Sequence, residues 1–317
     1  MDTFTPQFSF SCFYGVLSFV VYATTVCIIH SDRSTFSGSF YTLFTAGFFY
    51  NLLTFANSFV GLRVPQNTCY NCSLAPFFQS LNRNSTSRFP LHIFYGLQLY
   101  MAFPQYSMNL LITINRFTMF IWLNRNDQNW RQIIPFALIF VTFLPLTVTH
   151  GMFTNKSYFV YGPAIDGFIC QSEFDFQPLL TTILFFITLS IIISGVLNIA
   201  SLIFLHKLRG QIKKVDRNLL FVSLFSFCIE LINLTDTVLI KFRTVSPDWL
   251  VAFGLWLLPY CSDLITMSQP WVLILFNSAM QAKLKGLLCC GDSSNSGFVS
   301  VTSRQSALSV TAAAPKS

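Results

Sequence analysis

The sequence predicts an all-α fold, a bundle of seven transmembrane helices followed by a short amphipathic helix. Of its 317 residues, 53% are hydrophobic and only 10% are charged, whereas a soluble domain carries about 25% charged residues. The apolar stretches reach about 20 residues, the length that crosses a bilayer as a helix, and a barrel would show short alternating segments instead. The predicted spans are 8–29, 39–62, 91–123, 133–151, 179–205, 219–240 and 251–276.

The distribution of basic residues predicts which side each loop faces. With the N-terminus outside, 13 of the 19 basic residues lie in inner segments and six in outer ones, and Arg63 belongs to the first outer loop. Basic loops stay cytoplasmic, so we expect the N-terminus outside and the C-terminus inside. The net charge of +7 follows from this topology, and nucleic-acid binding is a poor interpretation of it. The first span lacks a convincing cleavage site, and we expect it to be retained as an anchor.

The predicted outer loops carry glycosylation sequons and cysteines. Asn71, Asn84 and Asn155 each begin an N-x-S/T sequon and are candidate glycan acceptors. Cys69, Cys72 and Cys170 lie outside, where disulfides persist. We expect Cys170 to bond to Cys69 or Cys72 and so link the two outer loops. A local Cys69–Cys72 bond is the alternative.

The chain after span seven predicts a helix along the inner leaflet. Met280, Leu284, Leu287 and Leu288 recur at helical spacing and form one apolar face. Cys289 and Cys290 follow and are candidates for palmitoylation. We therefore divide the chain into a receptor-sized bundle with its juxtamembrane helix, 1–290, and a Ser/Thr/Ala-rich tail, 291–317, that we expect to be disordered.

Basic residues on the inner face are candidates for contact with a partner. Arg116 lies at the inner end of span three, as either a snorkelling anchor or a switch residue that meets a cytoplasmic protein. The loop between spans five and six carries Lys213, Lys214 and Arg217 among its basic residues. That loop suits a protein partner or anionic lipid, and a plain positive-inside signal is the alternative.

Polar groups within the spans predict a conformational switch. Asn51 and Asn109 lie at depths that allow them to join Asp263 in one network, and Gln269-Pro270 interrupts the hydrogen bonds of span seven just below. We expect these residues to form a hinge. Helix–helix hydrogen bonding without a signalling role is the alternative.

A ligand cavity that opens to the outside is expected between the helices. Its predicted walls come from spans three, six and seven. They are Tyr95, Gln98, Leu99, Phe103, Asp236, Trp256 and Tyr260.

Motifs for catalysis are absent from the sequence. There is no G-x-S-x-G, no P-loop and no H-E-x-x-H. His30 and His206 lie on the inner side and His92 and His150 on the outer side, so they cannot share one metal ion. We expect no enzyme activity, no metal and no cofactor.

Two blocks of sequence resemble a known family. "LLITINRFTMFIWL" (110–123) and "LPYCSDLITMSQPWVLILF" (258–276) resemble the nematode seven-transmembrane chemoreceptors of the Srg superfamily, its Srg and Srv branches above all. The resemblance implies a rhodopsin-like G-protein-coupled receptor in the plasma membrane of sensory neurons, often in cilia. Asn115-Arg116 then takes the place of the acid–arginine pair of such receptors, and Gln269-Pro270 that of their N-P motif.

Three functions are compatible with these features. The first is a chemoreceptor that binds a small molecule outside and engages a heterotrimeric G protein through Asn115, Arg116 and the basic loop. The second is a ligand-gated cation channel of inverted seven-helix topology, which requires the N-terminus inside. The third is a small-molecule transporter, for which we would expect an internal repeat.

Overall fold

The structure is a computed structural model of the chain. It describes residues 6–85, 88–122, 125–163, 165–175, 177–207, 214–241 and 248–289. The predicted tail 291–317 lies outside these residues, as do Lys213 and Cys290. The side chains of Lys214, Trp256 and Cys289 are likewise outside the described part.

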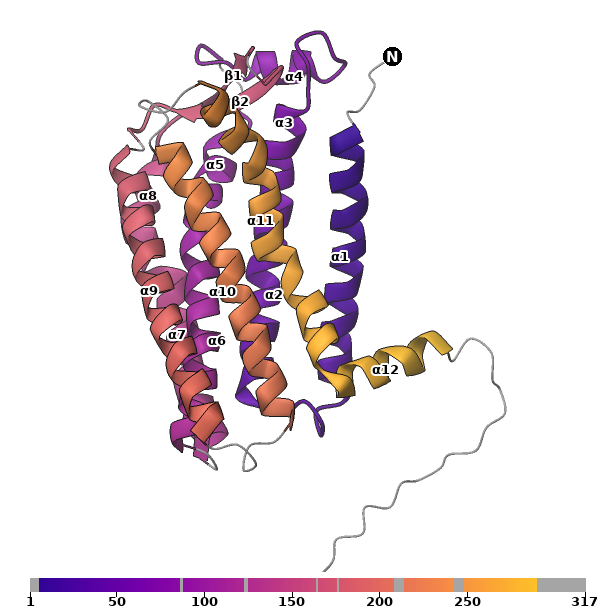
Figure 1. Cartoon of the computed structure of the whole chain (residues 1–317). Helices are drawn as coiled ribbons and strands as arrows, with labels where there is room; N and C mark the ends of the chain where they lie inside the picture. The colour runs from indigo at the N-terminus through magenta and orange to yellow at the C-terminus, as the bar shows by residue number, and fades with distance from the viewer. Residues whose placement is uncertain are drawn as a thin grey trace, which may run out of the picture.

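Long helices run side by side and form the bundle (Figure 1). The first two rods are α1 (Pro6–Ser31) and α2 (Ser39–Ser58), the latter prolonged by the π-helical turn η1 (Phe59–Arg63) and by α3 (Val64–Gln66). The third rod is α5 (Leu91–Tyr100) with α6 (Ala102–Trp122), and the fourth is α7 (Asn126–Phe143) with α8 (Leu146–Thr154). The last three are α9 (Gln177–Lys207), α10 (Lys214–Lys241) and α11 (Asp248–Phe276). The short helix α12 (Ser278–Cys289) follows.

Prolines explain where two of the rods are interrupted. Pro104 and Pro145 lack the N–H that would bond to the carbonyl four residues earlier, and the helices break at Met101 and near Leu144. Pro259 and Pro270 both lie inside α11, which stays helical through them.

The outer surface of the bundle is apolar. Among the described residues, five helical stretches are long and apolar enough to cross a membrane: Phe8–Ser31, Ser39–Gln66, Asn126–Thr154, Gln177–Lys207 and Arg217–Leu239. The rods of α5 with α6 and of α11 complete the seven predicted crossings. Large side chains such as Phe13, Phe136 and Phe185 are at least 70% exposed. Such a surface is stable against lipid and not against water.

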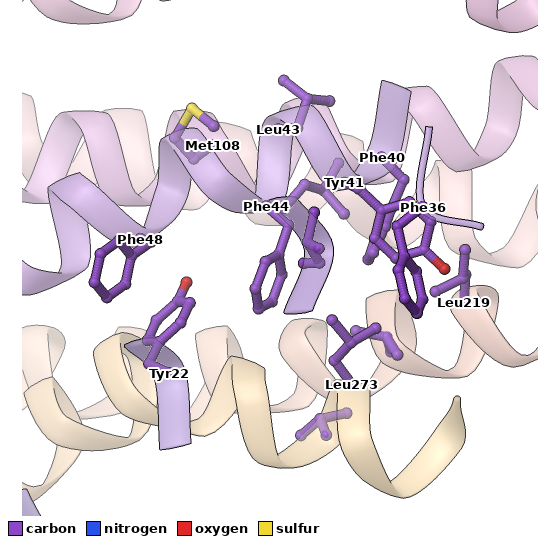
Figure 2. Close-up of a cluster of buried hydrophobic side chains, with 14 of the residues drawn as sticks. Tyr22, Phe36, Phe40, Tyr41, Leu43, Phe44, Phe48, Met108, Leu219 and Leu273 are labelled. Carbon is purple, nitrogen blue, oxygen red and sulfur yellow. The ribbon is translucent and has the colours of Figure 1, made fainter. Parts of the chain in front are cut away.

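Aromatic side chains fill the core between α1, α2 and α11. Tyr22 packs its ring 5.2 Å from that of Phe44 and 4.9 Å from that of Phe48, and Phe40 and Leu273 extend the cluster (Figure 2). Helix α6 contacts α2, α7, α9 and α10. Its buried face therefore lies at the centre of the molecule.

A small folded cap covers one end of the bundle, which we call the hairpin end (Figure 1). Strands β1 (Ser157–Gly162) and β2 (Gly167–Ser172) pair antiparallel and pack on α4 (Ala75–Ser80). The ring of Phe78 lies 5.0 Å from that of Phe159 and 5.5 Å from that of Phe168. The Phe159 amide also donates to the carbonyl of Leu81 at 2.9 Å.

The opposite end, which we call the α12 end, is fixed by polar contacts. Asn277 caps α12, since its Oδ1 accepts from the amides of Ala279 and Met280, while its Nδ2 donates to the Tyr41 hydroxyl at 2.9 Å. The Lys283 ammonium lies 2.8 Å from the Asp32 carboxylate. Together with the Ser34 hydroxyl, it lowers the pKa of Asp32. Helix α12 is thereby joined to the end of α1.

Gly167 is the point where the hairpin touches the bundle most closely, and its replacement tests that contact. A Cβ atom at Gly167 would overlap the backbone of Gln66, which cannot move aside as a side chain can. We expect Gly167→Ala to destabilise the protein by about 1–3 kcal/mol, as overpacking does. The measurement is the thermal unfolding temperature of the purified protein.

Gly286→Ala is the matched control, because no atom lies within 4 Å of a Cβ at Gly286 and alanine favours helix. Equal unfolding temperatures for both variants would show that the hairpin does not sit against Gln66.

Candidate functional site

A buried ion pair joins α2 and α11 in the hairpin-end half of the bundle. The Arg63 guanidinium bonds to the Asp263 carboxylate, and their side chains are only 2% and 6% exposed. The guanidinium carbon also lies 4.8 Å from the centre of the Phe55 ring. A buried charge without a partner is very costly, so each of these residues depends on the other.

This pair corrects two predictions. Arg63 is not in the first outer loop, because the helix continues through η1 as far as Gln66 and carries Arg63 into the bundle. Asp263 does not join Asn51 and Asn109, because Arg63 binds it instead. A carboxylate within span seven requires a cation, and Arg63 and Lys241 each lie one residue beyond a predicted span end on that side. That requirement was the available signal.

Below the ion pair, hydrogen-bonding side chains from α1, α2, α6 and α11 form one amide network. Gln269 Nε2 donates to Asn109 Oδ1 at 2.6 Å, and Gln269 Oε1 accepts from the Tyr22 hydroxyl at 3.0 Å and from Asn51 Nδ2 at 3.4 Å. Asn51 also donates to Tyr22 at 3.2 Å and accepts from Gln105 at 3.5 Å. The structure thus brings together Asn51, Asn109 and Gln269, with Pro270 next in α11. Sequence reasoning missed Tyr22 and Gln105.

Two acids of α10 lie in the core and behave differently. Glu230 is 2% exposed, and its carboxyl is hydrogen-bonded by the Asn109 side chain. Asp236 is 1% exposed, and neither of its carboxyl oxygens has a hydrogen-bond partner among the described residues. The Tyr106 hydroxyl on α6 also has no partner there. Buried polar groups are normally paired, so Asp236 and Tyr106 each keep unused hydrogen-bonding capacity.

The predicted ligand residues fall into separate environments. Tyr95, Leu99 and Phe103 pack around one apolar cluster, together with residues of α9, α10 and α11 such as Ile183 and Ile265. Gln98 lies instead against Gly61 of η1. Tyr260 is half-buried in α11, and the side chain of Trp256 is outside the described part.

At the α12 end, Arg116 is held inside the bundle. It is 5% exposed, its guanidinium carbon lies 4.7 Å from the centre of the Phe40 ring, and its Nη2 donates to Asn115 Oδ1 at 2.5 Å. Asn115 Nδ2 donates to Ser39 Oγ at 2.7 Å, and Ser39 Oγ donates to Asp127 Oδ1 at 2.7 Å. The Ser39 amide also donates to Asp127 at 2.9 Å. Arg116 is thus linked to the acid Asp127 through the side chains of Asn115 and Ser39. The residue directly before Arg116 is an amide, Asn115, and not an acid.

Among the described residues of the basic loop, Arg217 is exposed at the start of α10. Lys214 begins that helix, and Lys213 precedes it outside the described residues. Arg116 is therefore buried while Arg217, at the same end, faces outward.

Comparison with known proteins agrees with this arrangement. A family model described as "Srg family chemoreceptor" matches residues 8–284, nearly the whole chain. The chain belongs to the Srg family. It is 29% identical to Serpentine receptor class gamma-31 of Caenorhabditis elegans over 285 residues, which are 88% of this chain and 91% of that protein. It is also 22% identical to Serpentine receptor class gamma-2 of the same organism over 198 residues, which are 62% and 59% of the two chains.

Membership in the Srg family confirms the resemblance and the predicted fold class, an all-α seven-transmembrane bundle. It also decides between the Srg and Srv branches in favour of Srg. This Srg protein is a multi-pass membrane protein and a chemosensory receptor, and its family points to a receptor rather than an enzyme.

The outer cysteines of this Srg receptor pair locally, which corrects the predicted bond between loops. Cys69 and Cys72 form a disulfide across one turn, where the Cys72 amide donates to the Cys69 carbonyl and the Cα atoms lie 5.2 Å apart. That separation is within the range that a disulfide requires. Cys170 lies on β2 as a free thiol, and burial raises its pKa to about 12. Aromatic packing on α4, rather than a disulfide, joins the two loops.

The three sequon asparagines of the Srg receptor all lie at the hairpin end. Asn71 and Asn84 are exposed, and Asn155 is half-exposed with its Nδ2 donating to the Gly151 carbonyl at 2.7 Å. Their glycosylation stays a prediction, as does palmitoylation of Cys289 and Cys290.

The Arg63–Asp263 pair of this Srg receptor predicts a strong coupling between two mutations. Arg63→Met or Asp263→Leu alone should cost about 3–5 kcal/mol, because each leaves a buried charge unpaired. The double variant Arg63→Met/Asp263→Leu should be far more stable than the sum of the single effects implies. The readouts are surface expression and the thermal unfolding temperature.

Arg83→Gln serves as the comparison for this double-mutant cycle, because it breaks an exposed ion pair instead of a buried one. Arg83 pairs with Glu173 at 3.7 Å, but its side chain is 70% exposed, and exposed pairs contribute about 0–1 kcal/mol. Additive effects of the Arg63 and Asp263 variants would contradict the ion pair.

The local disulfide predicts a specific labelling pattern for the Srg receptor. Because only thiolate reacts readily, a maleimide should leave Cys170, which is half-buried and has a raised pKa, unlabelled in the folded protein. It should label Cys170 after the protein is unfolded without a reductant. Peptide mass spectrometry should find Cys69 and Cys72 unlabelled in both samples. A disulfide peptide that contains Cys170 would contradict the assignment.

Proposed function

We propose that this Srg receptor binds a small-molecule cue from outside the cell at its hairpin end and signals to a heterotrimeric G protein at its α12 end. The observation that carries the proposal is the chain of hydrogen bonds from Arg116 through Asn115 and Ser39 to Asp127. It links the ends of α6, α2 and α7 at the face that a cytoplasmic partner would meet. In this structure Arg116 is buried and therefore not accessible to a cytoplasmic partner.

Release of Arg116 is the step that we assign to activation. Only a ligand with a higher affinity for the released state can favour that state. Breaking one hydrogen bond of the chain would have the same effect without a ligand. Arg116 and Asn115, together with Lys213, Lys214 and Arg217 of the basic loop, are the residues that we propose contact the G protein.

The ligand, in this proposal, enters between α5, α6, α10 and α11. Tyr95, Leu99 and Phe103 line the apolar part of this region. Asp236 and Tyr106 supply its unpaired polar atoms. A ligand that carries a hydrogen-bond donor would satisfy Asp236 and gain the energy that an orphaned buried carboxyl forfeits.

The amide network is the proposed connection between the two ends. Gln269 of α11 bonds to side chains on α1, α2 and α6 at once, so a movement of α11 must break or exchange these bonds. Pro270 leaves the Thr266 carbonyl without its usual helical donor, which lowers the cost of bending α11 there.

We further propose that the N-terminus faces outside and that the receptor lies in the plasma membrane, in sensory cilia as the family resemblance suggests. The basic residues and the sequons support this orientation. The first experiment stains an epitope at the N-terminus and another after Ser317 in intact and permeabilised cells. Staining of intact cells at the N-terminus alone supports the receptor. Staining at the C-terminus alone would overturn G-protein coupling through Arg116.

Basal signalling provides a test that needs no known ligand. Ser39→Ala removes the hydroxyl that links Asn115 to Asp127, a hydrogen bond worth about 1 kcal/mol, and should raise basal G-protein activation about fivefold. Arg116→Ala should abolish both basal and raised signalling, because it removes the proposed contact. The measurement is energy transfer between G-protein subunits in cells with matched surface levels.

Arg131→Ala is the matched control for charge at this end of the bundle, because Arg131 is exposed on α7. Equal losses of signalling in Arg116→Ala and Arg131→Ala would contradict a specific function of Arg116.

A further inference from the structure

A cavity at the hairpin end, separate from the proposed transmembrane pocket, has the chemistry of an anion-binding site. It has a volume of about 440 Å³ and lies between the loop before α5, the start of α5 and the start of β1. This volume is within the range of pockets that hold small molecules, about 300–1,000 Å³. The sequence predicts a ligand-binding role for none of the residues that line it.

The charged groups in the lining are all basic. Arg88 and Lys156 line the cavity with His92, and no described lining residue is an aspartate or glutamate. Among the described residues, the ion pairs include neither Arg88 nor Lys156. The nearby carboxylate of Glu173 lies instead beside Arg83, outside the lining. The cavity therefore holds an uncompensated positive charge.

A buried hydroxyl in the wall has no partner. Ser157 is 8% exposed, and its Oγ makes no hydrogen bond among the described residues. A buried hydroxyl is normally paired, and its orphaned state costs about 1–3 kcal/mol. An acceptor atom bound in the cavity would remove this cost.

The backbone adds to the preference for an anion. Leu91 and His92, the first residues of α5, line the cavity, so the positive end of that helix dipole lies at the wall. The Lys156 ammonium donates to the carbonyls of Arg83 and Ser85 at 2.8 and 2.7 Å. These bonds fix the ammonium in place and hold the loop against β1.

Apolar side chains form part of the remaining wall, beside the polar Asn82, Ser85, Thr154 and Asn155. Leu81 and Leu91 are buried, and Phe89 stacks on Phe94 with ring centres 5.6 Å apart. An inorganic ion would leave this surface unused. We propose that the cavity binds a small organic anion whose acidic group lies at Arg88, Lys156 and Ser157 and whose apolar body lies against Leu81 and Phe89.

Direct binding to the full-length receptor tests this inference without any G protein, so its outcome is independent of the proposed signalling. The receptor is placed in phosphatidylcholine nanodiscs, which excludes anionic lipid as a source of the ligand. The probe is octanoate, compared with octan-1-ol and octylamine of the same chain length. We expect saturable binding of octanoate and at least about tenfold weaker binding of both other compounds, a difference of about 1.4 kcal/mol.

Two arginine variants locate the site. Arg88→Gln removes a charge from the lining and should weaken octanoate binding about tenfold. Arg83→Gln removes a charge from the same loop but outside the lining, and should leave the affinity within about twofold. Ser157→Val, which removes the orphaned hydroxyl, should weaken octanoate and leave octan-1-ol unchanged.

A glycan at Asn155 would lie at the cavity, because Asn155 also lines it. The same experiment therefore includes a variant that lacks this sequon. Asn155→Gln removes the sequon and should bind octanoate at least as tightly as the unchanged receptor. Equal binding of octanoate and octan-1-ol, equal losses in the Arg83 and Arg88 variants, or no saturable octanoate binding to well-folded Asn155→Gln would each overturn the inference. Unfolding temperatures verify that every variant is folded.

Discussion

The need to pair every charge within a medium that offers no water determines much of this structure. Arg63 and Asp263 bond to each other inside the bundle, and their bond fixes η1, the continuation of α2, against α11. The same constraint explains why Arg116 lies against an aromatic ring and an amide rather than in an apolar wall. Asp236 is the exception, since its carboxyl is buried without a hydrogen-bond partner among the described residues. Exceptions of this kind are typical of functional sites in membranes.

The polar groups are arranged in layers along the bundle axis. The ion pair lies toward the hairpin end, the amide network lies below it, and the Arg116 chain lies at the α12 end. Residues of α2 and α6 take part in the two lower layers, and residues of α11 in the two upper ones. Side chains of α2 and of its continuation η1 thus contribute to all three. A displacement of α2 or α11 changes more than one layer, which gives the proposed signal a physical route.

Sequence reasoning recovered the features that depend on length, periodicity and charge balance. The spans and the amphipathic helix after span seven follow from those properties, whereas the family was indicated by the resemblance of two sequence blocks. The depths of Asn51 and Asn109 predict that they share one network, and the structure joins both to Gln269, which the sequence places just below. The link from Asn115 to Asp127 was not foreseen, because it passes through Ser39, a residue with no sequence signal of its own. Arg63 was misplaced because helix ends cannot be fixed to within one turn from hydropathy. The disulfide was misassigned because pairing among three cysteines depends on a loop conformation that the sequence does not specify.

The π-helical turn at Phe59–Arg63 sets the rotation of everything that follows it on α2. In a regular α-helix each residue advances by roughly 100° about the axis, so one extra residue per turn resets the facing of the later residues by about that angle. Below the turn, α2 faces Gln269 with Asn51 and the carbonyl of Phe94 with Asn57. At the end of the turn Arg63 faces Asp263, and above it Gln66 faces the hairpin. A uniform helix cannot satisfy both sets of neighbours. The extra residue therefore rotates the later part of the helix about its axis relative to the earlier part. The alignment of the cap with the membrane core depends on this single turn of backbone.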